Sequence, residues 1–178
     1  MSDNASVATP PPDGAVVVGI DGSATSERAL AWAARYAEVE GRPLMIAHAL
    51  GTIVIPEAAG LAFDGGGTFA LVYDQLQAEG EALVTAAAKQ VAGSHGSVGV
   101  STVVELADPR QLLLQLAERA SIVVMGSRGR GAFRSLLLGS VTSGVAGRAR
   151  CPVVVIPATD ESQGEHAAPQ EGRARPQP

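Results

Sequence analysis

Lysine and cysteine are almost absent from this sequence of 178 residues. The single cysteine, Cys151, cannot form a disulfide within the chain, which fits a reducing environment, and we expect a cytoplasmic protein. The single lysine, Lys89, is not part of the glycine-rich loop described below, so a Walker A phosphate loop, which needs Gly-Lys-Ser/Thr, is excluded. Three scattered histidines and one cysteine form no pattern of metal ligands.

Long hydrophobic runs and excess positive charge are also lacking. No apolar run approaches the roughly 18 residues that a membrane helix needs, so we expect no membrane partner. The formal net charge of −5 disfavours a nucleic-acid partner held by bulk electrostatics. Apolar residues make up 46% of the chain, which is enough for one domain with a sizeable core.

Composition divides the chain into a foldable middle and two polar ends. Residues 1–13 are rich in Pro, Ser, Ala and Asp and carry no basic residue, so we expect a disordered tail rather than a secretory signal. Residues 158–178 are rich in Gln, Gly, Pro, Glu and Arg, and we expect a second disordered tail. The predicted domain is therefore 14–157.

Short apolar runs alternate with segments of helical periodicity along this domain. The runs that predict strands are Ala15–Ile20, Pro43–Ala49, Val98–Leu106, Ile122–Met125 and Pro152–Pro157. Helices are predicted over Ser26–Glu40 and Phe69–Val91, after the cap pair Asp108-Pro109, and from Gly139-Ser140 onward. This β-α alternation predicts one α/β domain of Rossmann-like type, with a five-stranded parallel sheet covered by helices on both faces. We expect the strand order 3-2-1-4-5, with ligands bound where strands 1 and 4 separate.

The loop after the fourth strand has the strongest functional signal. Gly126, Gly129 and Gly131 follow the strand, interleaved with Arg128 and Arg130. Glycines let the backbone approach a ligand closely, and successive N–H groups form a cradle for anions. The loop is therefore a candidate phosphate site, although a tight structural connection is the alternative. It does not match the dinucleotide fingerprint, because it lies late in the chain and its third glycine is missing.

The spacing of this loop resembles that of the universal stress protein family. That family carries Gly-x-x-Gly, nine residues, and then Gly-Ser/Thr, which correspond here to Gly126, Gly129, Gly139 and Ser140. The resemblance covers about residues 14–157. It implies an adenine nucleotide alpha hydrolase-like fold that binds ATP, with or without Mg²⁺.

The resemblance also implies which residues contact the nucleotide. Ala49 would bind the adenine edge through its backbone, and the segment Gly19-Ile20-Asp21 would form a first contact. The other residues implied at the site are Gly126, Ser127, Arg128, Gly129, Arg130, Gly139, Ser140, Val141 and Thr142.

Asp21 is open to several interpretations. It could contact a ribose hydroxyl, hold Mg²⁺ together with the phosphates, or serve only as a turn or helix-cap residue. A phospho-acceptor role needs neighbouring acidic residues and a lysine on a late strand, and both are missing. Ser140 is similarly open, because it could offer its hydroxyl and N–H to a phosphate, act as an ordinary N-cap, or do both.

The predicted function is nucleotide-dependent regulation in a stress response, exerted on an unidentified protein partner. The apolar strand Val153–Ile156 is expected at the sheet edge, where it would join two chains in a homodimer, as in related proteins, unless a tail covers it. The rivals are a dimeric interaction module of the same fold that binds no nucleotide, and a slow ATPase. No nucleophile, general base or carboxylate pair indicates fast turnover.

Overall fold

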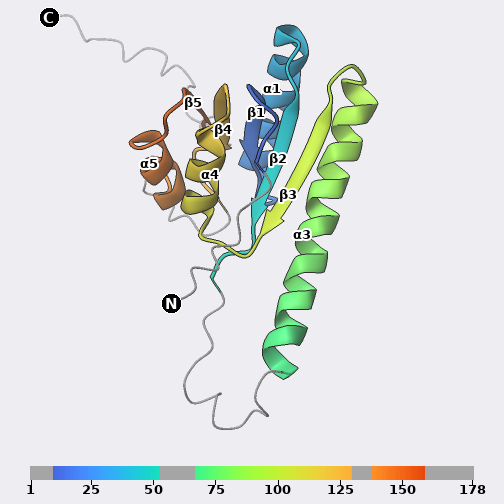
Figure 1. The fold of residues 1–178 in the computed structure, drawn as a ribbon, viewed down its shortest axis with the longest axis vertical. Coiled ribbons are helices and arrows are strands. Elements are labelled where there is room, and N and C mark those ends of the chain that lie inside the picture. Colours follow the sequence, from blue (N-terminus) through green and yellow to red (C-terminus); the bar gives the residue numbers. More distant parts are fainter. Residues whose placement is uncertain (1–9, 53–66, 130–137, 159–178) are drawn as a thin grey trace, which may run out of the picture.

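The computed structural model describes residues 10–52, 67–129 and 138–158, which form one parallel sheet with helices on both faces (Figure 1). The strands are β1 (Val16–Gly19), β2 (Leu44–Ala49), β3 (Val100–Glu105), β4 (Ile122–Gly126) and β5 (Val153–Ile156). The helices are α1 (Ala24–Glu40), α3 (Gly67–Ser94), α4 (Pro109–Ala117) and α5 (Ser140–Ala146). The strand order is β3-β2-β1-β4-β5, which confirms the predicted fold.

Helix α1 begins at Ala24, so the predicted start at Ser26 was wrong by two residues. Ser23 is the N-cap, and its Oγ accepts a hydrogen bond of 3.2 Å from the backbone N–H of Ser26. Ser26 is consequently buried inside the first turn, where its own hydroxyl donates to the Ser23 carbonyl. Gly41 ends the helix in a left-handed conformation with φ of 61°, as its position in the sequence predicts.

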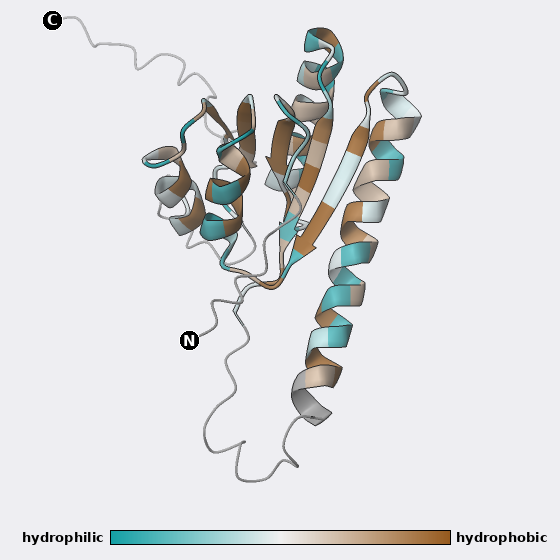
Figure 2. Ribbon diagram, viewed as in Figure 1, coloured by the Kyte–Doolittle hydropathy of each residue, from teal (hydrophilic) through white to brown (hydrophobic). Residues whose placement is uncertain are grey.

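Alternating strand residues build a core on each face of the sheet. Val18 and Ile46 point toward α1 and α3, whereas Val17, Met45 and Val123 pack against α4 and α5. All five residues are at most 1% exposed. Figure 2 shows this as hydrophobic colour along the central strands. Burial on both faces explains why these strands read as continuous apolar runs instead of alternating ones.

All five strands run in the same direction, so their carboxyl ends meet at one edge of the sheet. Helix α3 continues well past this edge, as Figure 1 shows. The first part of α3 therefore lies beside the region where ligands bind in open parallel sheets. None of the described helices is long and apolar enough to span a membrane.

Candidate functional site

A cavity of about 1060 Å³ opens at the carboxyl ends of β1, β2 and β4, with walls from helices of both layers. Most of the residues expected at the nucleotide site line it: Gly19, Ile20, Asp21, Ala49, Gly126, Arg128, Gly129, Gly139, Ser140, Val141 and Thr142. Ser127 does not line the cavity, and Arg130 lies outside the described residues. The fold thus gathers three distant segments of sequence around one space.

Asp21 lines this cavity and is held by several hydrogen bonds in the turn after β1. Its Oδ1 accepts hydrogen bonds from the backbone N–H of Ser23 at 3.1 Å and from the Ser23 hydroxyl at 2.7 Å. Its own N–H donates to the Ser26 hydroxyl at 3.3 Å. These bonds make Asp21 part of a turn, as one of the structural interpretations requires, and they also fix where its carboxylate lies.

The second glycine of the loop closes directly over Asp21. A Cβ atom added to Gly129 would lie 2.5 Å from Asp21 Oδ2. A Cβ atom on Gly126 would lie 2.8 Å from Thr25 Cγ2. Both glycines therefore make room for neighbouring side chains of this protein, a role that the sequence pattern alone does not reveal.

Two residues expected to contact nucleotide use their side chains inside the protein. Ser127 is 4% exposed, and its hydroxyl accepts a hydrogen bond of 3.0 Å from the N–H of Ala158. Thr142 is 2% exposed, and its hydroxyl donates to the Gly126 carbonyl at 2.9 Å. Thr142 also lines the cavity, and as the third residue of α5 its backbone N–H has no acceptor within the helix.

Helix α5 begins one residue earlier than a Ser140 cap would require. Gly139 is the N-cap, with φ of −70° and ψ of 163°, and it makes no side-chain cap bond. The N-cap interpretation of Ser140 was therefore wrong, because Ser140 is the first helical residue and is exposed. Its hydroxyl and N–H, together with the N–H of Val141, remain at the cavity wall.

Much of the cavity lining is apolar, including the part at the end of β2. Ala49 ends β2 there, and its neighbour His48 bonds through Nδ1 to the carbonyl oxygen of Ile20 at 2.8 Å. A carbonyl only accepts, so Nδ1 carries the proton. The apolar lining includes several residues that the sequence analysis did not assign to the site: Leu50, Leu76, Leu83, Leu112, Leu113 and Met125. Gly80, a glycine in the interior of α3, also lines the cavity. A glycine inside a helical pattern suggests close packing or function, so it was the sequence signal that could have placed α3 at the site.

Comparison with known proteins decides the family. The universal stress protein family model matches residues 14–157. The chain belongs to this family. Universal stress protein Rv2623 of Mycobacterium tuberculosis is 35% identical over 158 residues, which cover 87% of this chain and 49% of that protein. The chain spans about half the length of the curated relatives that it matches.

Solved structures of the family share the fold. Universal stress protein UspA from Lactobacillus plantarum superposes with a TM-score of 0.67 at 18% identity, covering 82% of this chain and 99% of that one. A universal stress protein solved in complex with cAMP has a TM-score of 0.57 at 27% identity, covering 83% and 98% of the two chains. The first similarity concerns the fold alone, whereas the second comes from a structure that contains an adenine nucleotide.

Among the described residues of this universal stress protein, no group of three or more His, Cys, Asp or Glu side chains could hold a metal ion. Asp21 and Glu79 are the carboxylates at the cavity, and they come from different elements, the β1–α1 turn and α3. Two carboxylates would not complete the coordination of a divalent cation, which would need further oxygen ligands such as water or a bound phosphate.

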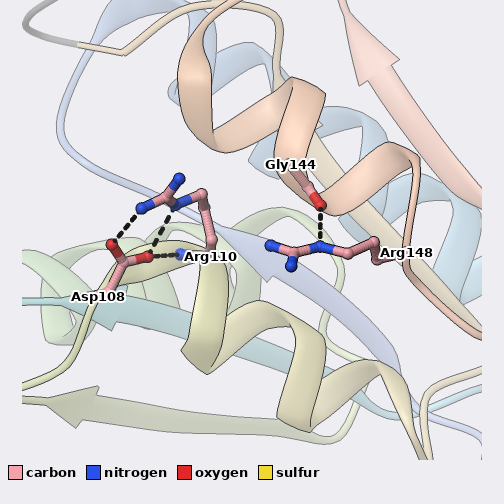
Figure 3. Close-up of polar contacts among 4 residues, drawn as sticks. All are labelled: Asp108, Arg110, Gly144 and Arg148. Carbon is pink, nitrogen blue, oxygen red and sulfur yellow. Dashed lines mark hydrogen bonds and ion pairs between the residues drawn. The ribbon is translucent and has the colours of Figure 1, made fainter.

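Two separate polar contacts flank the place where α4 lies beside α5, one in the first turn of α4 and one at the end of α5 (Figure 3). Asp108 caps α4 and pairs with Arg110 through bonds of 2.9 and 3.1 Å, which lowers the pKa of the Asp108 carboxyl from 3.8 to about 2. The Arg110 side chain crosses Gly144 so closely that a Cβ atom there would lie 2.8 Å from Arg110 Cδ. Arg148 Nε donates to the Gly144 carbonyl at 3.3 Å. The two helices meet here through the packing of the Arg110 side chain over Gly144.

Removing this cap should destabilise the protein in a pH-dependent way. We expect Asp108→Ala to lower the free energy of unfolding by about 0.5–2 kcal/mol at pH 7. Because the folded-state pKa of Asp108 is depressed, its charge stabilises the fold above pH 3.8 and loses this effect as pH falls through about 2. Urea unfolding at several pH values measures the difference. Asp108→Asn is the control, since it keeps the cap acceptor without the charge, and equal pH profiles for Asn and wild type would contradict the assignment.

Proposed function

We propose that this universal stress protein binds an adenine nucleotide, in the first place ATP, as a regulatory module. One observation carries the proposal: a single cavity is lined by Asp21, by the glycines of the family spacing and by the end of β2 at Ala49. Each of these was expected at the nucleotide site from the family resemblance. The cAMP complex of a relative at 27% identity supports the same ligand class.

The two ends of the cavity differ in the way that a nucleotide requires. At one end, Gly129, Ser140 and Val141 offer backbone N–H groups, and Arg128 is a half-buried guanidinium beside them. On the other side of β1, Ala49 at the end of β2 and the leucines of α3 form an apolar wall suited to a base. Asp21 lies between these ends, where a ribose hydroxyl would accompany the phosphates.

Mg²⁺ fits this site only as a companion of the nucleotide. Asp21 lines the cavity beside the glycine loop and is the carboxylate nearest to the proposed phosphate position. One carboxylate plus phosphate oxygens is a usual environment for Mg²⁺ in nucleotide sites. The protein residues would then orient the polyphosphate and neutralise part of its charge.

We assign the bound nucleotide a regulatory role and treat fast hydrolysis as the weaker alternative. The titratable groups lining the described cavity are Asp21, Glu79, His48 and Arg128. His48 donates its Nδ1 proton to a backbone carbonyl, and Asp21 is fixed by Ser23, so both act first as structural groups. Occupancy would act on a protein partner through the surfaces next to the cavity, in particular the projecting part of α3.

A homodimer is proposed through β5. Within the part of the chain that the structure describes, this strand pairs with β4 on one side only, and its four residues are half-buried. An apolar edge strand of this kind is protected when a second copy pairs with it. We also propose that the protein is cytoplasmic.

One preparation tests both proposals. The purified protein is denatured and the released small molecules are separated by chromatography, and calorimetric titration then compares ATP, cAMP and GTP. We expect a released adenine nucleotide, or micromolar ATP affinity with at least about tenfold preference over GTP. Sedimentation of the same sample at micromolar concentration should give a dimer. Absence of any adenine-nucleotide binding would favour the rival interaction module, and a purely monomeric sample would dispose of the β5 dimer.

A further inference from the structure

We propose that Ser127 is a positioning residue that couples the glycine loop to the chain leaving β5. Its backbone N–H donates to the Ile156 carbonyl at 2.7 Å, and its carbonyl accepts from the N–H of Gly139 at 2.8 Å. Its hydroxyl accepts from the N–H of Ala158 at 3.0 Å. One buried residue thus holds the end of β4, the N-cap of α5 and the exit of β5 together.

Thr142 of α5 makes further hydrogen bonds to the same segment. Its Oγ1 donates to the Gly126 carbonyl at 2.9 Å and lies 3.5 Å from the Ser127 carbonyl. The first turn of α5 is therefore tied to the same dipeptide, Gly126-Ser127, that the β5 exit reaches from the other side. Both hydroxyls are almost completely removed from solvent, so water does not compete for these bonds.

The arrangement has a consequence for the cavity. Ser127 does not line it, but both of its neighbours do, and so does Gly139. A shift of Ala158 would move Ser127 and with it the backbone groups on either side. The loop that we assign to phosphate is therefore linked to β5, the edge strand of the proposed dimer. The part of this inference that concerns ligand rests on the proposed function.

A hydroxyl is not needed merely to fill this position. A buried alanine would leave little more than the volume of one oxygen atom, and a neutral hydrogen bond adds only a modest net stability. The hydroxyl instead fixes the position of the Ala158 backbone relative to Ser127. If Ser127 only stabilises the fold, Ser127→Ala should cause a small loss of stability spread evenly over the protein. If Ser127 couples the two segments, the variant should change amide exchange at both Ala158 and Gly139.

The first experiment uses ligand-free protein and amide hydrogen exchange. In Ser127→Ala we expect the amides of Ala158 and Gly139 both to exchange about fivefold faster or more. The matched control is Ser121→Ala at the other end of β4, which removes a hydroxyl bond of 3.1 Å to the Ala15 carbonyl and should leave both amides unchanged. Faster exchange at Ala158 with unchanged exchange at Gly139 would overturn the coupling.

The second experiment adds ATP. In wild type we expect ATP to slow exchange at Ala158, which lies outside the cavity lining, as well as in the loop. In Ser127→Ala the loop should still be protected while Ala158 is not. Thr142→Val should lower ATP affinity severalfold, and Thr142→Ser, which keeps the hydroxyl, should restore it. Equal protection at Ala158 in wild type and Ser127→Ala would overturn the inference. A wild type that binds no ATP would instead refute the proposed function, and the ligand-free comparison would still decide the coupling.

Discussion

Replacing Gly129 with alanine should lower ATP affinity at least about tenfold, a loss of about 1.4 kcal/mol. The new Cβ atom would lie 2.5 Å from Asp21 Oδ2, closer than any non-bonded contact allows. Gly129 has no positive φ, so alanine fits its backbone and only the contact matters. The carboxylate must then turn away and give up its bonds to Ser23 of 2.7 and 3.1 Å. Asp21 would leave the position from which, in the proposed function, it contacts the nucleotide.

A double-mutant cycle in the ligand-free protein separates this cause from a general defect of the loop. Gly129→Ala should destabilise wild type more than it destabilises an Asp21→Ala background, with a coupling of about 0.5–3 kcal/mol. Gly139→Ala is the control within the same motif, because its Cβ atom would meet the Ser127 carbonyl at an ordinary 3.5 Å. Chemical denaturation gives all of these free energies. Equal losses in the two backgrounds would show that the Asp21 contact is not the reason for this glycine.

The fold was predictable because its signals are local and repeated. The three central strands β1, β2 and β4 are short apolar runs that are largely buried. Gly41 and Asp108 mark helix ends by capping chemistry that acts within a few residues. The errors in helix starts have the same local origin. At α1, Ser23 and Ser26 are both good caps, and only the folded turn shows that Ser23 makes the cap bond.

The candidate site was predictable only in part. The glycine spacing located the loop, but the contacts that explain Gly126, Gly129 and Ser127 join residues that are distant in sequence. A sequence pattern shows that a small residue is present without showing what lies next to it. The apolar wall was missed for a related reason, since the leucines of α3 read as ordinary core residues until the helix is seen to extend past the sheet.

Gly80→Ala in α3 is the second change with a large expected effect. It should destabilise the protein, although alanine has a higher helix propensity than glycine. A Cβ atom at this position would lie 2.8 Å from Leu50 Cδ2, 2.9 Å from Val104 Cγ1 and 3.0 Å from His48 Cδ2. Leucine can rotate away, but the valine is stiff at χ1 and His48 is tied to the Ile20 carbonyl at 2.8 Å. Overpacking of this kind costs about 1–3 kcal/mol, which exceeds the gain of about 0.5–1 kcal/mol for alanine over glycine in a helix.

The same helix contains the control. Gly93 is exposed, and a Cβ atom there would meet nothing within 4 Å, so Gly93→Ala should be neutral or stabilising. Both variants gain the helix propensity of alanine. The difference between their free energies of unfolding therefore reports mainly the packing cost at Gly80. We expect Gly80→Ala to unfold with a free energy about 1–3 kcal/mol below that of Gly93→Ala. Gly80→Ala should also weaken ATP binding, because α3 and His48 form one wall of the cavity and must shift. Two variants of equal stability would mean that α3 moves outward freely at Gly80, and this wall would then be too loose to shape a site for the base.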